Sequence, residues 1–137
     1  MKAFWFVVIT MFSLSVSAQE KVEFEEIVKA IKEGQINDLS PFFANTVECD
    51  MFGKNNIYSK AQVTQVMKDF FNQNKPKQFK VNHQGGQGQV KFIIGTYQTI
   101  IGKKYRISCF IKQESGKKDQ IQQIRIEDAA DSKVDNM

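Results

Sequence analysis

Histidine, cysteine and proline are scarce in this sequence, and each scarcity excludes a kind of site. The 137 residues include one His, two Cys and two Pro. A single histidine excludes a zinc site built on two histidines, and Cys49 and Cys109 are too far apart to form a Cys-x-x-Cys pair. The hydrolase elbow Gly-x-Ser-x-Gly and the phosphate loop Gly-x-x-x-x-Gly-Lys-Ser/Thr are also missing. We therefore expect no metal, no cofactor and no assignable catalytic residue.

Long hydrophobic runs are missing as well, except at the N-terminus. Lys2 precedes an apolar run over residues 3–12, and small residues then end at Ala18. The run is too short for a membrane-spanning helix, and its small-residue end is typical of a signal peptidase site. The sequence therefore predicts a signal peptide over residues 1–18, a periplasmic or secreted protein, and no transmembrane segment in the mature chain. We expect one domain over residues 19–127 and a disordered polar tail over residues 128–137.

Two stretches have the spacing of amphipathic helices. Residues 24–32 carry apolar side chains at i, i+3, i+4 and i+7, and Gly34 supplies a stop. The second helix is expected over residues 60–72. Ser59, directly before it, and Gln62, three residues on, have the spacing of a capping box. The second helix carries an apolar stripe wide enough to lie against a sheet, formed by Val63, Val66, Met67, Phe70 and Phe71. A short helical turn is expected between them, at residues 36–43.

Strand patterns occupy most of the remaining chain. They cover residues 46–52, 79–84, 90–101, 104–113 and 120–127. Helices first and a strand meander last is the order of an α+β fold, so we expect N-terminal helices packed on a curved antiparallel sheet of about five strands. Gly95, inside the longest strand, predicts a bend or bulge.

The turn at Gly102 decides which face of the two longest strands is buried. A two-residue turn assigns one face to the core, namely Phe92, Ile94, Thr96, Gln98 and Ile100 with Tyr105, Ile107, Cys109 and Ile111. The opposite, outer face then carries four apolar residues that we take as a candidate interface, namely Ile93, Tyr97, Ile101 and Phe110.

Few residues have the character of a catalytic group. His83 continues the alternation of Phe79 and Val81, so we expect it to point inward. There it could donate a proton, although a partly buried histidine bonded to backbone is the favoured interpretation. Glu48 and Asp50 share a strand face and could be an acid/base pair, but such pairs are more often a solvated face.

Any pocket should lie at the Tyr58 end of the second helix. Three tyrosines, at positions 58, 97 and 105, could hydrogen-bond a ligand, although such residues are commoner as rim packing. The residues that we expect around the pocket are Tyr58, Met67, Phe71, His83, Gln98 and Tyr105.

The placement of the two cysteines and of the basic residues favours structural roles for these side chains over disulfide formation or nucleic-acid binding. Cys49 and Cys109 each alternate with apolar neighbours, which favours buried thiols over a disulfide. Residues 103–125 hold seven basic side chains against two acidic ones, Glu114 and Asp119. Such a segment could bind nucleic acid or an anionic surface, but lysine in hairpin turns is ordinary solvation and edge protection. We therefore expect no nucleic-acid partner.

Four segments carry a resemblance to a known family, namely IVKAIKEGQINDLSPFFANTVE, GKNNIYSKAQVTQVMKDFFNQNKPKQF, IIGTYQTIIGKKYRI and IQQIRIE. Over residues 24–127 the chain resembles the domain-of-unknown-function 4783 family of exported Bacteroidota proteins. The resemblance implies a nuclear-transport-factor-2-like fold, a cone whose sheet wraps a long helix, and it implies no activity. It also implies that the C-terminal strand separates Cys49 from Cys109, so we expect no disulfide.

Three functions follow as hypotheses. The leading one is a binding or interaction module that uses the cone mouth or the outer sheet face, with a small ligand, an envelope protein or a second copy as partner. The second is an enzyme for a small apolar molecule in the cone, with His83 or Asp50 as base and Tyr58 or Tyr97 as donor; it fails if the second helix fills the cone. The third is a structural accessory of a cell-envelope complex.

Overall fold

The computed structural model describes the backbone of residues 17–129 and the side chains of residues 24–129. Over residues 17–129 the fold has three helices and six strands, together with a short 3₁₀ turn, η1. In chain order the elements are α1 (Ser17–Glu33), α2 (Ile36–Leu39), η1 (Ser40–Phe42), β1 (Phe43–Met51), β2 (Lys54–Ser59), α3 (Lys60–Gln73), β3 (Pro76–Gln87), β4 (Val90–Thr99), β5 (Lys104–Lys112) and β6 (Gln120–Asp128).

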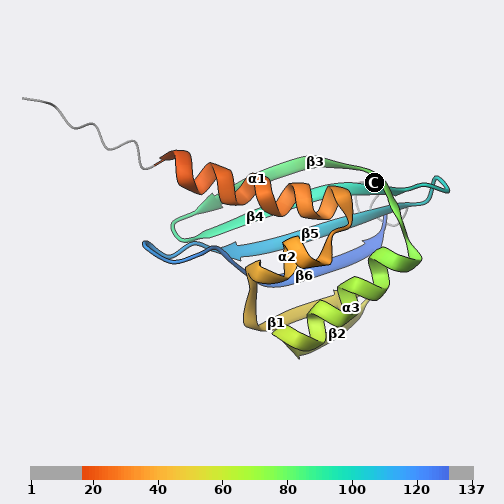
Figure 1. Ribbon diagram of the computed structural model, residues 1–137, viewed down its shortest axis with the longest axis horizontal. Helices are drawn as coiled ribbons and strands as arrows, with labels where there is room; N and C mark the ends of the chain where they lie inside the picture. The colour runs from red at the N-terminus through yellow and green to blue at the C-terminus, as the bar shows by residue number, and fades with distance from the viewer. Residues whose placement is uncertain (1–16, 130–137) are drawn as a thin grey trace, which may run out of the picture.

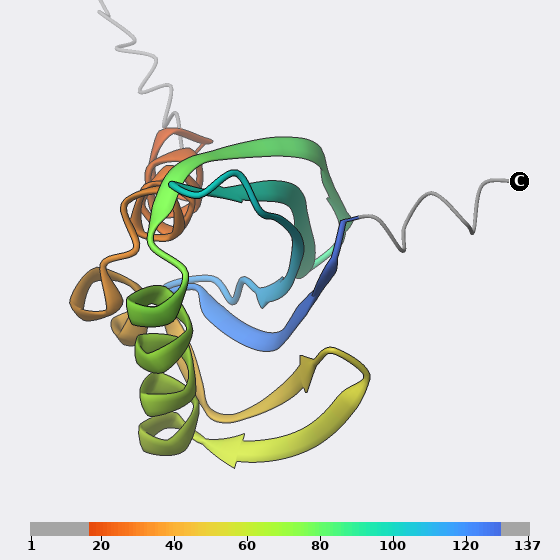
Figure 2. The same cartoon turned by 90° about the vertical axis from the view of Figure 1, so that its right-hand side faces the viewer.

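One six-stranded sheet, in the order β2-β1-β6-β5-β4-β3, carries all the helices on one face. In Figure 1, α1 lies over β3 and β4, and α3 lies over β1 and β2. Figure 2 shows the strands curving away from the stacked helices. Neighbouring strands are antiparallel except β1 and β6, which are parallel. The predicted α+β class and curved sheet are confirmed, although one pairing of the sheet is parallel.

The sixth strand, β2, is the element that the sequence did not predict. It pairs with β1 at the edge of the sheet, and every residue except the half-buried Tyr58 is exposed. A strand without a buried face has no alternation of polarity, and the pair Asn55 and Asn56 has the composition of a turn. The strand count is therefore six where the sequence indicated about five.

Helix α3 forms as its sequence predicts. The Ser59 hydroxyl accepts a hydrogen bond from the Gln62 N–H at 3.2 Å, and the Gln62 side chain accepts one from the Ser59 N–H at 2.9 Å. This capping box satisfies backbone donors that the first turn would leave unpaired. The side chains that the helix buries against the sheet are Val63, Met67, Phe70 and Phe71.

The β4–β5 hairpin differs from the prediction by one residue, and that difference inverts a strand. The Thr99 N–H donates to the Lys103 carbonyl at 2.8 Å, which leaves a three-residue loop that ends at Gly102, with a φ of +86°. Because side chains alternate along a strand, one extra loop residue moves every β4 side chain to the other face.

The predicted faces of β4 were therefore wrong. Ile93 and Tyr97 are 1% and 0% exposed and belong to the core, not to the outer face. Gln98 lies on the outer face, where its side chain accepts a hydrogen bond from Gln78 at 2.9 Å. The half-buried outer positions of β4 are Phe92, Ile94, Thr96 and Gln98, and they lie beside Phe110 of β5.

A bulge in β3 changes the orientation of His83 in the same way. Val81 pairs with Gly95 and His83 with Ile94, so one residue of β3 has no partner between them. His83 is consequently exposed, and its predicted inward orientation was wrong. The irregularity lies opposite Gly95, where a Cβ would come within 2.5 Å of the Phe79 ring. Glycine is needed there because the phenyl ring lies directly over the β4 backbone.

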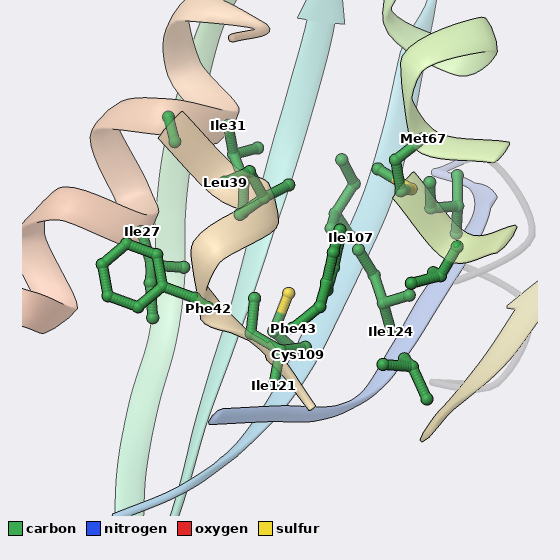
Figure 3. Close-up of a cluster of buried hydrophobic side chains, with 14 of the residues drawn as sticks. Ile27, Ile31, Leu39, Phe42, Phe43, Met67, Ile107, Cys109, Ile121 and Ile124 are labelled. Carbon is green, nitrogen blue, oxygen red and sulfur yellow. The ribbon is translucent and has the colours of Figure 1, made fainter. Parts of the chain in front are cut away.

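The two cysteines lie in the core on opposite sides of β6. Cys49 of β1 and Cys109 of β5 both pair with Ile124, and both thiols are free and buried. Two strand spacings separate them, about 10 Å, which is more than a disulfide spans. Burial raises the pKa of Cys49 to about 11 and that of Cys109 to about 12. Figure 3 shows Cys109 beside Ile121 and near Phe43 in the core.

The ends of the chain carry two further predictions. Residues 1–16, which hold most of the predicted signal peptide, and residues 130–137, which hold most of the predicted tail, lie outside the described residues. Ser17 and Ala18 form the first residues of α1, and Asp128 is the last residue of β6.

Candidate functional site

An open depression of about 690 Å³ lies where α3 ends. It is bounded by the end of β1 with its turn into β2, the C-terminal half of α3, the start of β5 and the end of β6. The lining residues are Met51, Phe52, Val66, Asp69, Phe70, Gln73, Asn74, Lys103, Tyr105 and Asp128. In Figure 1 this is the right-hand end of the molecule, where α3 passes into β3.

The floor of the depression is an aromatic cluster held by one asparagine. The Phe70 ring lies 5.4 Å from that of Tyr105 and 5.5 Å from that of Tyr97, centroid to centroid. The Tyr97 hydroxyl donates to the Asn74 carbonyl at 2.5 Å, and the Tyr105 hydroxyl donates to the Asn74 side-chain oxygen at 2.9 Å. Burial raises the pKa of Tyr97, so its hydroxyl stays a donor. Asn74 itself caps α3 by donating to the Phe70 carbonyl.

Charged groups line the rim. The Lys103 ammonium lies 5.1 Å from the centroid of the Tyr105 ring, a cation–π contact. A hydrogen bond to Tyr105 is the largest cause that raises the pKa of Lys103, and the charge of Asp128 adds to it. On the α3 side, Asp69 accepts a hydrogen bond from the Gln65 amide at 2.9 Å. The rim thus offers both signs of charge over an apolar floor.

Phe52 forms one wall in an unfavourable backbone conformation. Phe52 and Gly53 are the two loop residues between paired Met51 and Lys54, and their φ values of +55° and +86° are those of a type I′ turn. Such turns favour Asn-Gly, and a bulky residue with positive φ is a genuine outlier. The Phe52 side chain is 49% exposed, and its ring meets that of Tyr105 at 5.7 Å.

Among the predicted pocket residues, the lining includes Tyr105 alone. Met67 and Phe71 are buried in the core, and Tyr58 precedes the opposite end of α3. His83 and Gln98 lie on the outer side of the sheet. The structure therefore does not bring the six predicted residues together, because the β4 inversion and the β3 bulge turn two of them away.

The residues proposed for an enzyme have structural roles. Glu48 accepts a hydrogen bond from Asn55, while Asp50 accepts one from the Gly53 N–H at 3.0 Å and lies 3.5 Å from Arg125. These contacts fix the β1–β2 hairpin and its link to β6. The ionisable side chains that line the depression are Asp69, Lys103, Tyr105 and Asp128, and none of the residues proposed as a catalytic base is among them.

The interior of the sheet is likewise filled. Met67, Phe70 and Phe71 are at most 4% exposed and occupy the space between α3 and the strands. The open space beside α3 therefore lies at the end of the helix, not between these side chains and the strands.

Sequence reasoning missed most of the site, including Phe52, Asp69, Gln73 and Lys103. One signal was available, because Phe-Gly stands at a hairpin turn where Asn-Gly is usual. The others come from elements far apart in the chain and carry no pattern of their own.

The basic segment is largely paired within the fold. Lys112 and Lys117 each lie 3.0 Å from Glu114, and Arg106 lies 3.6 Å from Glu127. Lys118 lies over the Phe42 ring at 4.6 Å. Among the residues that the structure describes, no three side chains are grouped to hold a metal ion, and no helix has the length and apolar character to cross a membrane.

Comparison with known proteins gives a family and a fold. The family model described as "Domain of unknown function (DUF4783)" matches residues 24–127. A DUF4783 family protein from Bacteroides ovatus is 34% identical, with a TM-score of 0.70 over 75% of this chain and 92% of that one. One from Bacteroides uniformis is 30% identical, with a TM-score of 0.71 over 77% and 95%. A search of curated proteins found no match.

A more distant structure shows the fold alone. A protein of the NTF2-like family from Streptomyces avermitilis is 13% identical and has a TM-score of 0.60, over 81% of this chain and 94% of that one. The architecture is therefore that of the nuclear-transport-factor-2-like fold.

Phe52→Asn and Phe52→Leu separate the backbone strain from the ring contact. Both substitutions remove the aromatic contact with Tyr105, but asparagine tolerates positive φ and leucine does not. We expect Phe52→Asn to be more stable than Phe52→Leu by about 1 kcal/mol in urea unfolding. Equal stabilities would show that the turn stores no strain.

Proposed function

The chain belongs to the family described as "Domain of unknown function (DUF4783)", and we propose that it is an exported, non-enzymatic module that binds a small ligand in the depression at the end of α3. The single observation that carries the proposal is the depression itself, which combines a fixed aromatic floor with a few charged groups. Small-molecule sites have this composition, since apolar walls supply affinity and a few polar groups fix orientation. Export rests on the signal-peptide pattern of residues 1–18.

The conformation of Phe52 supports the same proposal. A bulky residue in the left-handed region costs about 1–3 kcal/mol, and such strain is concentrated at ligand clamps and active sites. Here the strain holds a half-exposed ring at the mouth of the depression. The lining residues suit binding, because an apolar floor supplies affinity and the few charged groups at the rim fix the orientation of a ligand.

The mixed charge of the rim indicates which chemical class of ligand the depression can bind. Asp69 and Asp128 can accept hydrogen bonds from a donor or cation, while Lys103 can pair with an anionic group. The apolar floor favours an aromatic or aliphatic body. An amphiphilic molecule with one charged end fits this distribution.

Blocking the depression should abolish binding. Gln73→Trp places an indole at the rim, whereas Lys68→Trp places one on an exposed α3 position outside the lining. We expect saturation-transfer NMR to detect fragments with an apolar body and one charged group on the wild type and on Lys68→Trp. The signals should fall at least fivefold on Gln73→Trp. If no fragment binds the wild type, or if both variants retain every signal, the proposal is wrong.

A second candidate is a homodimer through the outer sheet face, which no helix covers in Figure 2. Phe92 and Phe110 contact each other there, with ring centroids 6.4 Å apart, and Phe110 is 38% exposed. Val90 adds a further apolar side chain that is 52% exposed. These residues replace Ile93 and Tyr97 as the candidate contacts, since the core holds the latter two.

Charge at the centre of this face tests the dimer. Phe110→Glu should convert a dimer to a monomer in light scattering, because two carboxylates would meet unpaired across a twofold contact. Ile57→Glu adds the same charge at an exposed β2 position and should leave the mass unchanged. A monomeric wild type, or a Phe110→Glu variant that stays dimeric, would contradict this interface.

A further inference from the structure

The tip of the β4–β5 hairpin presents two isoleucines to solvent. Ile100 is 63% exposed and Ile101 is 84% exposed, although isoleucine is among the residue types most often buried. They occupy the first two positions of the three-residue loop that ends at Gly102. The loop is held by the bonds between Thr99 and Lys103, so the two side chains project from a fixed turn.

Four lysines surround this tip, two in strands β3 and β5 and two in the connections that precede these strands. The Ile100 N–H donates to the Lys75 carbonyl at 2.9 Å, which places the α3–β3 connection against the loop. Pairing of Pro76 with Thr99 and of Gln98 with Lys104 brings the starts of β3 and β5 to the same end. We call Lys75, Lys77, Lys103 and Lys104 the lysine cluster; all four are exposed.

Most of this charge is not neutralised within the fold. Among residues 24–129, Lys75, Lys77 and Lys104 have no salt bridge, unlike the basic side chains at positions 106, 112, 117 and 125. Asp128 is the acidic group near Lys103. The tip therefore combines exposed aliphatic side chains with an excess of positive charge behind them.

We propose that this hairpin tip docks on an anionic lipid surface. Ile100 and Ile101 enter the boundary between headgroups and acyl chains, and the lysine cluster contacts the headgroup phosphates. An interfacial segment buries its apolar side by only about 5–10 Å, which side chains at a turn can reach. Each lysine near an anionic surface adds favourable free energy that falls away within a Debye length.

The shape of the tip favours a lipid surface over a protein partner. A stable protein interface buries about 800 Å² on each side, and it is built around a flat or concave patch with aromatic anchors. Two aliphatic side chains on a convex turn supply neither. The excess of positive charge around the tip, four lysines with Asp128 near one of them, is complementary to an anionic headgroup layer.

Vesicle sedimentation tests the proposal. The probes are vesicles of phosphatidylcholine alone and of phosphatidylcholine with phosphatidylglycerol. We expect the full chain to partition onto the anionic vesicles. In the double variant Lys75→Gln/Lys77→Gln, each lysine removed should weaken the partitioning by about fivefold. Ile100→Ser/Ile101→Ser should weaken partitioning by about tenfold or more, since it removes both inserted side chains. Ile57→Ser, at an exposed β2 position, is the matched control and should bind as the wild type does.

A local probe separates the tip from the apolar N-terminal run, which every variant shares. An environment-sensitive fluorophore is attached to Ile101→Cys or, as control, to Ile57→Cys. Labelling is selective because Cys49 and Cys109 are buried and the pKa of each is raised. The emission of the label at position 101 should shift to the blue on anionic vesicles, and this shift should be lost in high salt, while the label at position 57 should not change.

Absence of a shift at position 101 overturns the proposal, and the tip then becomes a candidate protein contact. An equal shift on neutral vesicles overturns it as well, because the lysine cluster would contribute nothing. Neither outcome bears on ligand binding in the depression.

Discussion

The packing of α3 against the tyrosines of β4 and β5 is the interaction on which the structure depends. Phe70 contacts the rings of Tyr97 and Tyr105, and both hydroxyls donate to Asn74 at the end of the same helix. The asparagine thus ends α3 and satisfies two buried hydroxyls that would otherwise cost about 1–3 kcal/mol each. This cluster of three aromatic rings and one asparagine therefore holds α3 against β4 and β5 and forms the floor of the depression.

Local chemistry made part of this fold predictable. The capping box at Ser59 and Gln62, the apolar stripe of α3 and the alternation around Cys49 depend on neighbours within a few residues, and each formed as predicted. These local patterns also gave the order of the elements, helices first and strands last, and that order indicated the α+β class. The family resemblance added the position of β6 between β1 and β5, which no local pattern contains.

The faces of β3 and β4 were not predictable in this way. A two-residue and a three-residue loop at Gly102 have nearly the same sequence signal, yet they place Ile93 and Tyr97 on opposite sides. The bulge before His83 lies opposite Gly95, where the Phe79 ring packs over the β4 backbone, and the alternation of residues 79–83 does not reveal which residue is left unpaired. The candidate pocket inherited both errors, while the observed depression joins ends of β1, α3, β5 and β6 that only the folded chain brings together. Lys103 belongs both to that depression and to the hairpin tip, so the two proposed surfaces lie at one end of the molecule.

The free energy of unfolding of Phe70→Ala tests the central claim most directly. Phe70 is 4% exposed and contacts Tyr97 and Tyr105, so its truncation removes nearly a whole buried aromatic side chain and should cost about 3–5 kcal/mol in denaturant unfolding. Lys68→Ala, on an exposed position of the same helix, should change stability by no more than about 0.5 kcal/mol. A loss below about 1 kcal/mol for Phe70→Ala would contradict the account, because the helix would then not be packed on the tyrosines.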